Sequence, residues 1–178
     1  RIRKKFSPLL SDDSNTLKQM VEVITRQTDD IRRIVDEFSK FARMPELKRK
    51  NEDLGVLIES IITLQQAGQP NVSINFSKPK IPVIVSVDAT LINQAITNIL
   101  KNAGEAISSR MLKEPSAEEP GKINVSLREN IESVILTISD NGIGWPQDRS
   151  RLFEPYVTTR EKGTGLGLAI VKKIVEEH

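Results

Sequence analysis

The sequence has no cysteine and only one histidine, His178, among its 178 residues. Without cysteine the chain can form no disulfide, no thiolate metal site and no cysteine nucleophile, which is compatible with a reducing compartment. Aromatic residues make up only 4% of the chain and do not interleave with the basic residues, and the net charge is only +2. This composition argues against a nucleic-acid partner, because such surfaces combine clustered positive charge with stacking side chains.

Long apolar runs are missing as well. No run approaches the roughly 20 residues that a membrane-spanning helix needs, and no apolar stretch of a signal peptide follows the basic segment Arg1 to Lys5. These absences leave a cytosolic location open for this chain. The hydrophobic share of 38% and the charged share of 28% suit one or two domains with much exposed helix.

A repeating apolar pattern predicts a long amphipathic helix in the first fifty residues. Its members alternate in spacing between four and three, and all but one are apolar; they are Leu17, Val21, Ile24, Thr28, Ile31, Val35, Phe38 and Ala42. Such spacing is typical of the seam of a coiled coil or a four-helix bundle. Asp12, Asp13 and Ser14 are candidate N-cap residues, and Pro45 is expected to end the helix.

This helix is expected to form a homodimer through residues 14–44. Additional apolar residues, among them Met20, Ile34 and Phe41, widen the stripe and favour a bundle. Arg1 to Phe6 has the character of the end of a preceding helix, so the predicted helical hairpin has a first arm that is mostly missing. The alternative is that the helix packs on the C-terminal part of its own chain.

The rest of the chain mixes helical and strand patterns, which predicts an α+β fold of two layers. Helices are expected at residues 54–64, 90–107 and 165–177, strands at 72–76, 83–87, 123–127 and 134–138, and a loop at 111–121. The predicted organisation is a dimerisation segment at residues 1–46, a polar linker at 47–53 and a second domain at 54–178.

Two asparagines stand one helical turn apart in the helix expected at residues 90–107. Asn98 and Asn102 therefore share a face, where their carboxamide oxygens offer hard ligands to a cation. Mg²⁺ is usually held by a few protein oxygens together with phosphate oxygens and water. Asn102 is the predicted metal ligand, with Asn98 in support. The plain alternative is that both residues solvate a helix surface.

A carboxylate and two glycines follow the last predicted strand. Asp140 ends the apolar run, and Gly142 and Gly144 allow a flat ligand to approach the backbone closely. Asp140 can accept a hydrogen bond from the exocyclic amine of adenine, whereas guanine has a carbonyl at that position. An ordinary turn is the alternative, because Asn-Gly is a common turn dipeptide.

A third motif opens the last helix with glycines. Gly163, Gly165 and Gly167 match neither a dinucleotide fingerprint nor a Walker A loop. They suit a hinge joined to a helix start, where free amides and the helix dipole attract an anion.

The order of the three motifs resembles the ATP-binding domain of two-component sensor histidine kinases, a group related to gyrase, the Hsp90 chaperones and MutL. The amino-acid sequences of residues 35–45 and 152–160 are similar to those of nitrogen-regulation sensor kinases of the NtrY type. The resemblance implies a Bergerat-type sandwich that binds ATP and Mg²⁺, and a mobile lid between the second and third motifs. The implied nucleotide-binding residues are Asn98, Asn102, Asp140, Gly142, Gly144, Thr159, Arg160, Gly163, Thr164, Gly165, Leu166, Gly167 and Leu168.

The residue at position 98 separates two reaction classes. In the chaperone and gyrase relatives the matching position holds a glutamate that activates water, whereas the carboxamide of Asn98 cannot accept a proton. The resemblance therefore implies a protein-histidine kinase that transfers the γ-phosphate to a histidine and then to an aspartate of a response regulator. An ATPase of the gyrase type, a serine kinase or anti-sigma switch, and a nucleotide-free scaffold are the alternatives.

The phosphoacceptor histidine is absent from this sequence. His178 lies at the end of the last helix and is read as an ordinary helix-end residue. The chain alone is therefore expected not to phosphorylate itself. The resemblance also implies that this chain is a cytoplasmic domain, whose parent protein is anchored in the bacterial inner membrane through segments absent from this sequence and acts in nitrogen-related signalling. Phe153 and Tyr156 are expected to pack the lid down, and Arg160 and Lys162 either neutralise phosphate or face solvent.

Overall fold

The computed structural model describes residues 14–42, 46–113, 119–158 and 163–178. The chain divides into two compact units, Arg1–Pro45 and Glu46–His178. The domain limits expected from the sequence, at 1–46, 47–53 and 54–178, stay a prediction. The arm expected at Arg1 to Phe6, the caps Asp12 and Asp13, and Pro45 lie outside the described residues.

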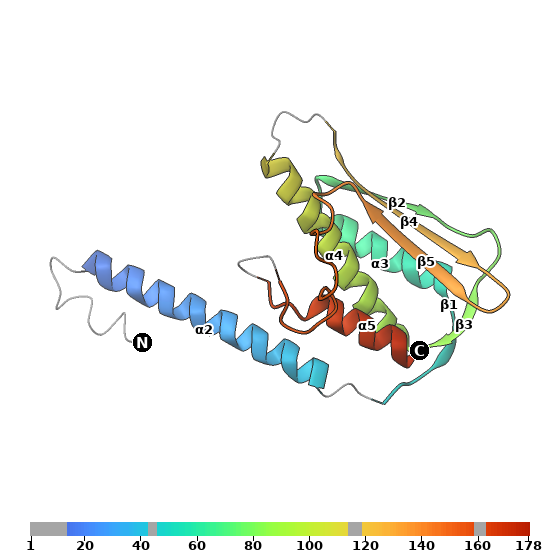
Figure 1. The fold of residues 1–178 in the computed structure, drawn as a ribbon, viewed down its shortest axis with the longest axis horizontal. Helices are drawn as coiled ribbons and strands as arrows, with labels where there is room; N and C mark the ends of the chain where they lie inside the picture. Colours follow the sequence, from blue (N-terminus) through green and yellow to red (C-terminus); the bar gives the residue numbers. More distant parts are fainter. Residues whose placement is uncertain (1–13, 43–45, 114–118, 159–162) are drawn as a thin grey trace. The chain divides into compact units, whose positions relative to one another are not determined.

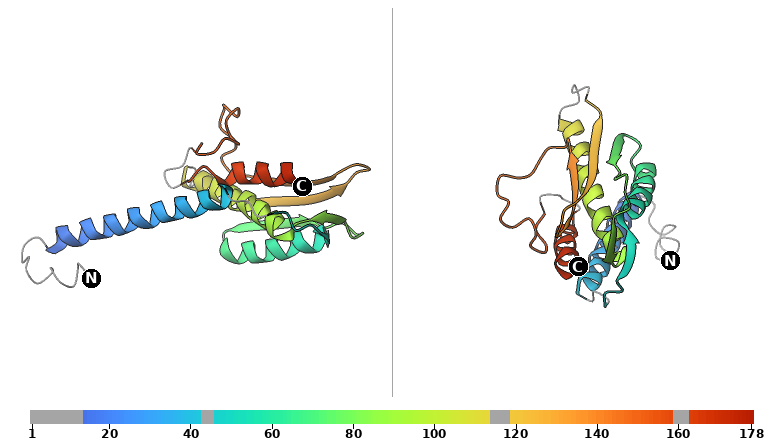
Figure 2. Two further views of the ribbon diagram at one scale, coloured as in Figure 1. Left: turned by 90° about the horizontal axis from the view of Figure 1, so that it is seen from below. Right: turned by 90° about the vertical axis from the view of Figure 1, so that its right-hand side faces the viewer.

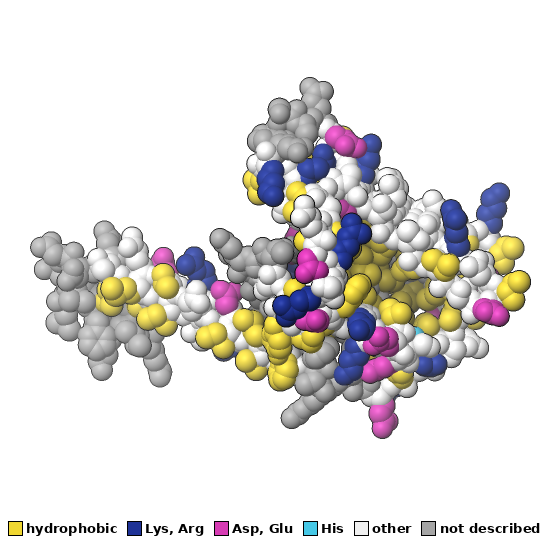
Figure 3. Space-filling view, viewed as in Figure 1, with side chains coloured by type: hydrophobic (Ala, Val, Ile, Leu, Met, Phe, Trp, Pro, Cys, Tyr) yellow, Lys and Arg dark blue, Asp and Glu magenta, His cyan; other side chains and the backbone are white. Residues whose placement is uncertain are grey.

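The first unit contains helix α2 (Ser14–Ala42), which follows the predicted amphipathic pattern. Its apolar stripe is solvent-exposed: Ile24 is 64% exposed and Ile31 is 61% exposed. Apolar side chains are visible along the helix in Figure 3. The hydroxyls of Thr25 and Thr28 donate to the carbonyls of Val21 and Ile24, both at 2.8 Å, and so need no outside partner.

The second unit is built on a three-stranded sheet in the order β2-β4-β5. Strand β2 (Val72–Ser77) runs parallel to β4 (Gly121–Glu129), and β4 runs antiparallel to β5 (Val134–Asp140). Side chains alternate along β4, so that Ile123, Val125 and Leu127 are buried while their neighbours face outward. The strands expected at residues 123–127 and 134–138 form a β-hairpin, β4–β5, whose turn is closed by the Asn130 amide, which donates to the carbonyl of Ser133 at 2.8 Å.

Three helices form the second layer: α3 (Leu54–Gly68), α4 (Ala89–Lys113) and α5 (Gly167–Glu177). Helix α4 packs against α3, α5, β4 and β5, and the ribbon in Figures 1 and 2 shows it in the middle of this layer. Leu100 and Ile107 of α4 are fully buried, and both belong to the main core together with Ile58 and Ile123. The predicted mixed fold of helices over a sheet is confirmed. None of the described helices has the length and apolarity to cross a membrane.

The expected linker is in part a strand, which corrects the sequence-based expectation for four residues. Strand β1 (Lys50–Asp53) pairs antiparallel with β3 (Ile84–Val87), with Lys50 opposite Val87. The segment Lys-Asn-Glu-Asp has no apolar residue, so its sequence lacks the alternation of apolar and polar residues that predicts a strand. The Asp53 side chain then caps α3 by accepting from the amide of Gly55 at 2.9 Å.

The loop expected at residues 111–121 is also shorter than predicted. Helix α4 continues through Met111 to Lys113, and β4 begins at Gly121. Residues 114–118 lie outside the described part of the chain. Arg110, in the last turn of α4, donates from Nη2 to the carbonyl of Glu119 at 2.9 Å, so the two ends of this connection are held together.

A buried aspartate joins the start of α4 to the segment that precedes β1. Asp88 is 7% exposed, and its Oδ1 accepts from the amides of Thr90 (3.0 Å) and Leu91 (3.2 Å), which caps α4. Its Oδ2 accepts from the amide of Lys48 at 3.0 Å. The bond from Lys48, followed by those from Leu91 and Thr90, holds the pKa of the Asp88 carboxyl below its ordinary value of 3.8, against the opposing effect of burial.

The single histidine completes this junction. The Asp88 amide donates to Nε2 of His178 at 3.1 Å, and Nδ1 of His178 donates to the carbonyl of Ile174 at 2.7 Å. The guanidinium of Arg49 also donates to the carbonyl of Glu177. The end of α5 is therefore tied to the chain segment that enters this unit, and His178 has a structural role that the sequence did not indicate.

We predict that Asp88→Asn lowers the free energy of unfolding by about 1–2 kcal/mol near neutral pH. The amide nitrogen of the variant would meet the Lys48 amide donor to donor, although the helix cap can persist. Because the folded-state pKa of Asp88 lies below 3.8, its contribution is complete above the unfolded pKa and is lost as the pH falls through the folded pKa. Urea unfolding between about pH 7 and pH 3 measures this.

The matched control is Glu132→Gln, which removes an exposed carboxylate in the β4–β5 turn. It should leave the free energy of unfolding within about 0.5 kcal/mol of the parent value. Equal loss of stability on acidification in the parent and in Asp88→Asn would contradict the assignment.

Candidate nucleotide-binding site

The two asparagines of α4 face the beginning of α5. One face of α4 is buried in the core, and Asn98 and Asn102 lie partly exposed on another face. Nδ2 of Asn98 donates to the carbonyl of Gly167 at 3.4 Å. Nδ2 of Asn102 lies 3.9 Å from the point where a Cβ of Gly167 would stand. Two segments that are about 65 residues apart in sequence thus meet at these side chains.

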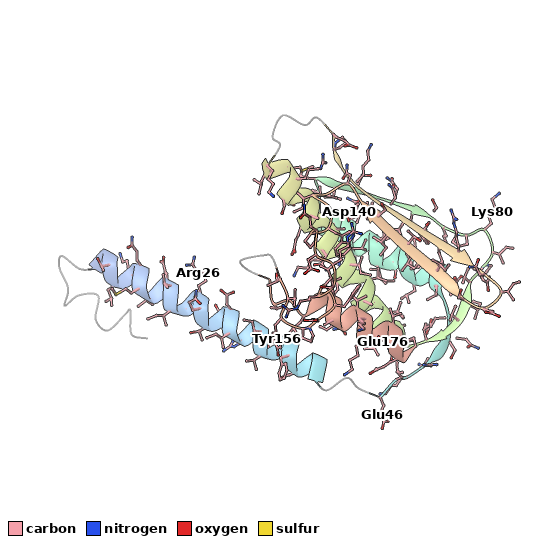
Figure 4. The ribbon with its side chains drawn as sticks, in the orientation of Figure 1. Arg26, Glu46, Lys80, Asp140, Tyr156 and Glu176 are labelled. Carbon is pink, nitrogen blue, oxygen red and sulfur yellow. The ribbon has the colours of Figure 1, made fainter. Side chains whose placement is uncertain are left out.

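The turn after β5 lies against the same helix, one turn beyond Asn102. The Ile143 amide donates to the carbonyl of Ala106 at 3.3 Å. A Cβ at Gly142 would stand 2.6 Å from that of Ala106, so only glycine permits this approach. The amide of Gly142 donates to Oδ1 of Asp140 at 2.9 Å, which orients the exposed carboxylate at the end of β5 (Figure 4).

The third motif reaches α5 through a strained turn. Gly165 has a φ of +69°, and a Cβ there would stand 2.6–2.8 Å from backbone atoms of Tyr156 and Val157. The Tyr156 amide donates to the carbonyl of Gly165 at 3.1 Å, which joins the middle of the segment between β5 and α5 to its end. Tyr156 is labelled in Figure 4. Tyr156 itself has a φ of 66°, an uncommon value for a residue with a side chain.

The first turn of α5 is left without a side-chain cap. Leu166 is fully buried and anchors this turn, while its amide donates to Oγ1 of Thr164 at 3.4 Å. The amides that follow, beginning with Gly167, lie beside Asn98 and Asn102. A helix N-terminus of this kind favours an anion through its free amides and its dipole.

The predicted site residues are brought together only in part. Asn98 and Asn102 meet Gly167, and Asp140 and Gly142 lie against α4 at Ala106. Gly144 is exposed and has a φ of +74°, with open space around it, and Gly163 is exposed. Leu168 is partly buried in the first turn of α5. Thr159, Arg160 and Lys162 lie outside the described residues.

The aromatic residues of the lid differ from expectation. Phe153 is 49% exposed and Tyr156 is 56% exposed, so about half of each residue faces solvent and neither is part of the buried core. Trp145, which follows Gly144, is likewise 58% exposed. Phe153 and Tyr156 were expected to pack the lid down, but the segment between β5 and α5 forms no helix or strand in its described part that would cover them.

Sequence reasoning missed two residues that hold the site, one outside the motifs and one inside the second motif. Ala106 supplies both a carbonyl and a surface to the turn after β5, and Asn141 joins that turn to β4. Small residues such as Ala106 carry no chemical signal. Among the described residues, no group of three His, Cys, Asp or Glu could hold a metal ion. A cation here would depend on carboxamide and phosphate oxygens.

The fold and the arrangement of this site have counterparts among known proteins. Residues 87–178, just over half of the chain, match the family of histidine kinase-, DNA gyrase B- and HSP90-like ATPases. The chain belongs to this family. The predicted resemblance is confirmed at this level.

Particular relatives narrow the class further. Over 179 residues, the nitrogen regulation protein NtrY of Azorhizobium caulinodans is 45% identical, with 100% of this chain and 23% of that protein covered. A putative NtrY-like sensor histidine kinase of Rickettsia felis is 37% identical, with 100% and 28% covered. The chain thus resembles sensor histidine kinases of the NtrY type, and it spans about a quarter of the length of these curated relatives.

Solved structures agree with the fold. A histidine kinase, ThkA, in complex with the response regulator TrrA has a TM-score of 0.69 at 26% identity, covering 99% of this chain and 50% of that one. The mycobacterial sensor histidine kinase MprB has a TM-score of 0.59 at 26% identity, covering 73% and 80%. Both of these similar structures are histidine kinases. Their likeness supports the assignment of the mixed fold to an ATP-binding domain.

We predict that Gly165→Ala destabilises the protein by at least about 1–2 kcal/mol, because alanine is strained at positive φ and its Cβ would overlap the Tyr156 backbone. Gly167→Ala is the matched control. Its Cβ would meet Nδ2 of Asn102 at 3.9 Å, an ordinary contact, so stability should change by less than about 0.5 kcal/mol. Thermal unfolding of both variants measures the difference, and equal melting temperatures would contradict the argument.

Proposed function

We propose that this chain is the ATP-binding part of a protein-histidine kinase that holds ATP together with Mg²⁺. The observation that carries the proposal is the meeting of Asn98 and Asn102 with the uncapped start of α5. Carboxamide oxygens and free amides there suit a triphosphate and its cation. The turn at Asp140, held against the same helix, supplies a separate acceptor suited to a base.

Adenine is the proposed base. Oδ1 of Asp140 accepts from the Gly142 amide, so Oδ2 is the oxygen proposed to accept from the exocyclic amine of adenine. Guanine has a carbonyl oxygen at this position, which would face the carboxylate acceptor to acceptor. Gly142 and Gly144 let the backbone pass the base closely.

Phosphates and metal are assigned to the other end of the site. Asn102, with Asn98 in support, is the proposed Mg²⁺ ligand, and water and phosphate oxygens would complete the octahedron. The proposed phosphate contacts come from the lid end and the first turn of α5: Thr159, Arg160, Gly163, Thr164, Gly165, Leu166, Gly167 and Leu168. When bound, Mg²⁺ neutralises charge on the phosphates.

The proposed reaction is phosphoryl transfer to histidine rather than to water. Asn98 has no basic oxygen, and its nitrogen already donates to Gly167, so it cannot deprotonate water. A neutral imidazole nitrogen would attack the γ-phosphorus, the bond to the bridging oxygen would break, and ADP would leave. His178 is a poor acceptor because both of its ring nitrogens are engaged, one with Asp88 and one with Ile174. The acceptor is proposed to lie on a segment outside this sequence.

A response regulator and nitrogen-related signalling complete the proposal. A similar solved structure is a histidine kinase bound to a response regulator, and a similar curated protein is named for nitrogen regulation. We propose that the phosphoryl group passes from histidine to a regulator aspartate, with contacts near Arg26 to Arg33 of α2. The parent protein is proposed to be anchored in the bacterial inner membrane, with this part in the cytoplasm.

The nucleotide assignment is tested by calorimetric titration. ADP with Mg²⁺ should bind more tightly than GDP, and Asp140→Asn should weaken ADP by about tenfold or more because one hydrogen bond to a charged acceptor is lost. Asn102→Ala should remove most of the gain in affinity that Mg²⁺ provides. Glu132→Gln is the control, because it also exchanges a carboxylate for an amide but lies in the exposed β4–β5 turn, outside the proposed site. In a separate incubation of the parent protein with ATP and Mg²⁺, ATP should remain intact for hours, as expected without a general base.

Two results would count against this proposal. Equal affinity for ADP and GDP would exclude the role of Asp140 in base selection. Rapid release of inorganic phosphate from ATP by this chain would favour an ATPase of the gyrase type. The expectation that this sequence alone does not phosphorylate itself stays a prediction.

A homodimer through residues 14–44 is also proposed. The apolar stripe of α2 remains exposed in Ile24, Ile31 and Val35, and burying such a stripe against a second copy is favourable by about 25 cal/mol per Å². The spacing of four and three places these residues along one seam.

We predict that Ile24→Glu with Ile31→Glu converts a dimer into a monomer, because unpaired carboxylates at a buried seam are costly. Glutamate is a good helix former, so α2 itself should persist. Arg26→Glu is the matched control, since it changes the charge by the same two units away from the seam and should leave the dimer intact. Light scattering measures all three proteins. A monomeric parent chain would mean that the seam needs a further helix or packs within one chain.

A further inference from the structure

The side chain of Asn141 makes two hydrogen bonds to the start of β4. Its Oδ1 accepts from the amide of Lys122 at 2.8 Å, and its Nδ2 donates to the carbonyl of Pro120 at 3.0 Å. Its own backbone amide donates to the carbonyl of Lys122 at 3.2 Å. The nucleotide site proposed above gives this residue no role, although it stands between Asp140 and Gly142.

These bonds replace one rung of the β4–β5 ladder. The last regular pair joins Ile123 to Asp140, so Asn141 is the next residue opposite Lys122. In each hydrogen-bonded pair of an antiparallel ladder, the two residues exchange two backbone bonds. Here the bond from the Lys122 amide goes to the Asn141 side chain instead of its backbone carbonyl. The chain can therefore leave the sheet at once and turn toward α4.

The segment before β4 that accepts from Asn141 is held in place by α4. Pro120 follows Glu119, whose carbonyl accepts from Nη2 of Arg110 at 2.9 Å. The Arg110 side chain is only 12% exposed, so this contact is held within the body of the domain. On the other side of the turn, the Ile143 amide donates to Ala106 at 3.3 Å. Asp140 and Gly142 thus sit in a turn that is held from two directions.

We propose that Asn141 is a positioning residue that sets the orientation of the Asp140 carboxylate and thereby the selectivity for an amino group on the bound base. Both polar atoms of its side chain are turned to β4, so it does not contact the nucleotide. A neutral carboxamide is required, because one atom must accept and the other must donate. This inference rests on the proposed nucleotide site.

The test compares two ligands that differ by one amino group. ADP and purine riboside 5′-diphosphate, which has hydrogen in place of the exocyclic amine, are titrated in the presence of Mg²⁺. The parent protein should prefer ADP. Asn141→Ala should lower this preference by about tenfold, the size expected for one misaligned bond to a charged acceptor. Affinity for the analogue should stay within about twofold of the parent value.

Asn75→Ala is the matched control. Asn75 lies on β2 of the same sheet, where its side chain donates to Asn124 at 3.4 Å on the exposed face. The ligand preference of this variant should equal that of the parent. Asn141→Asp provides a second variant in case Asn141→Ala does not fold, because it keeps the acceptor for Lys122 and loses only the donor to Pro120. It should also lose preference for ADP.

The outcomes separate the two proposals. A parent protein that prefers ADP, with Asn141 variants that keep the full preference, overturns the inference and leaves the nucleotide site standing. Equal weakening of both ligands in the variants means that Asn141 is merely structural, which also overturns it. A parent protein that binds both ligands equally overturns the adenine assignment itself, and the inference falls with it.

Discussion

The burial of α4 is the constraint on which the site depends. Leu100 and Ile107 are fully enclosed between the sheet and the neighbouring helices, so the rotation of α4 about its axis is fixed by the core. That rotation alone decides that Asn98 and Asn102 emerge toward α5 and that Ala106 meets the turn after β5. Because side-chain positions on a helix are rigidly related, the packing that stabilises the fold also sets the geometry of the site.

Close backbone approach is the second requirement. Gly142 lies against Ala106, and Gly165 lies against Tyr156, in both cases at distances that a Cβ would make impossible. The first contact holds the beginning of the segment between β5 and α5 against α4, and the second holds the middle of that segment against its end, just before α5. The strain at positive φ is concentrated in the segment that joins β5 to α5, which is where a change in conformation would meet the least resistance from the core.

The spacing of apolar residues predicted the helices and strands that bury one side. It gave no prediction for elements that bury no apolar side chain. Alternation in residues 123–127 and helical spacing in residues 90–107 predicted β4 and α4 because both bury apolar side chains. Strand β1 was missed because Lys50 to Asp53 pair through their backbone and contribute no apolar side chain. The parallel pairing of β2 with β4 joins residues about fifty positions apart, which no local pattern encodes. The motifs placed Asp140 in the candidate site, but the contacts that hold its turn come from Ala106 and Asn141, whose roles arise only in three dimensions.

The Asn141–Gly142 turn has a consequence for the chemical lifetime of the protein. In a flexible chain, the nitrogen of a glycine that follows asparagine can attack the side-chain carbonyl, because no Cβ stands in the way, and ammonia is lost. In the folded protein the Gly142 nitrogen is directed to Asp140, and the Asn141 carboxamide is held at β4 by both of its polar atoms. The hydrogen bonds that shape the turn therefore also slow its spontaneous deamidation, so that ageing at this position should be confined to chains that have lost their structure.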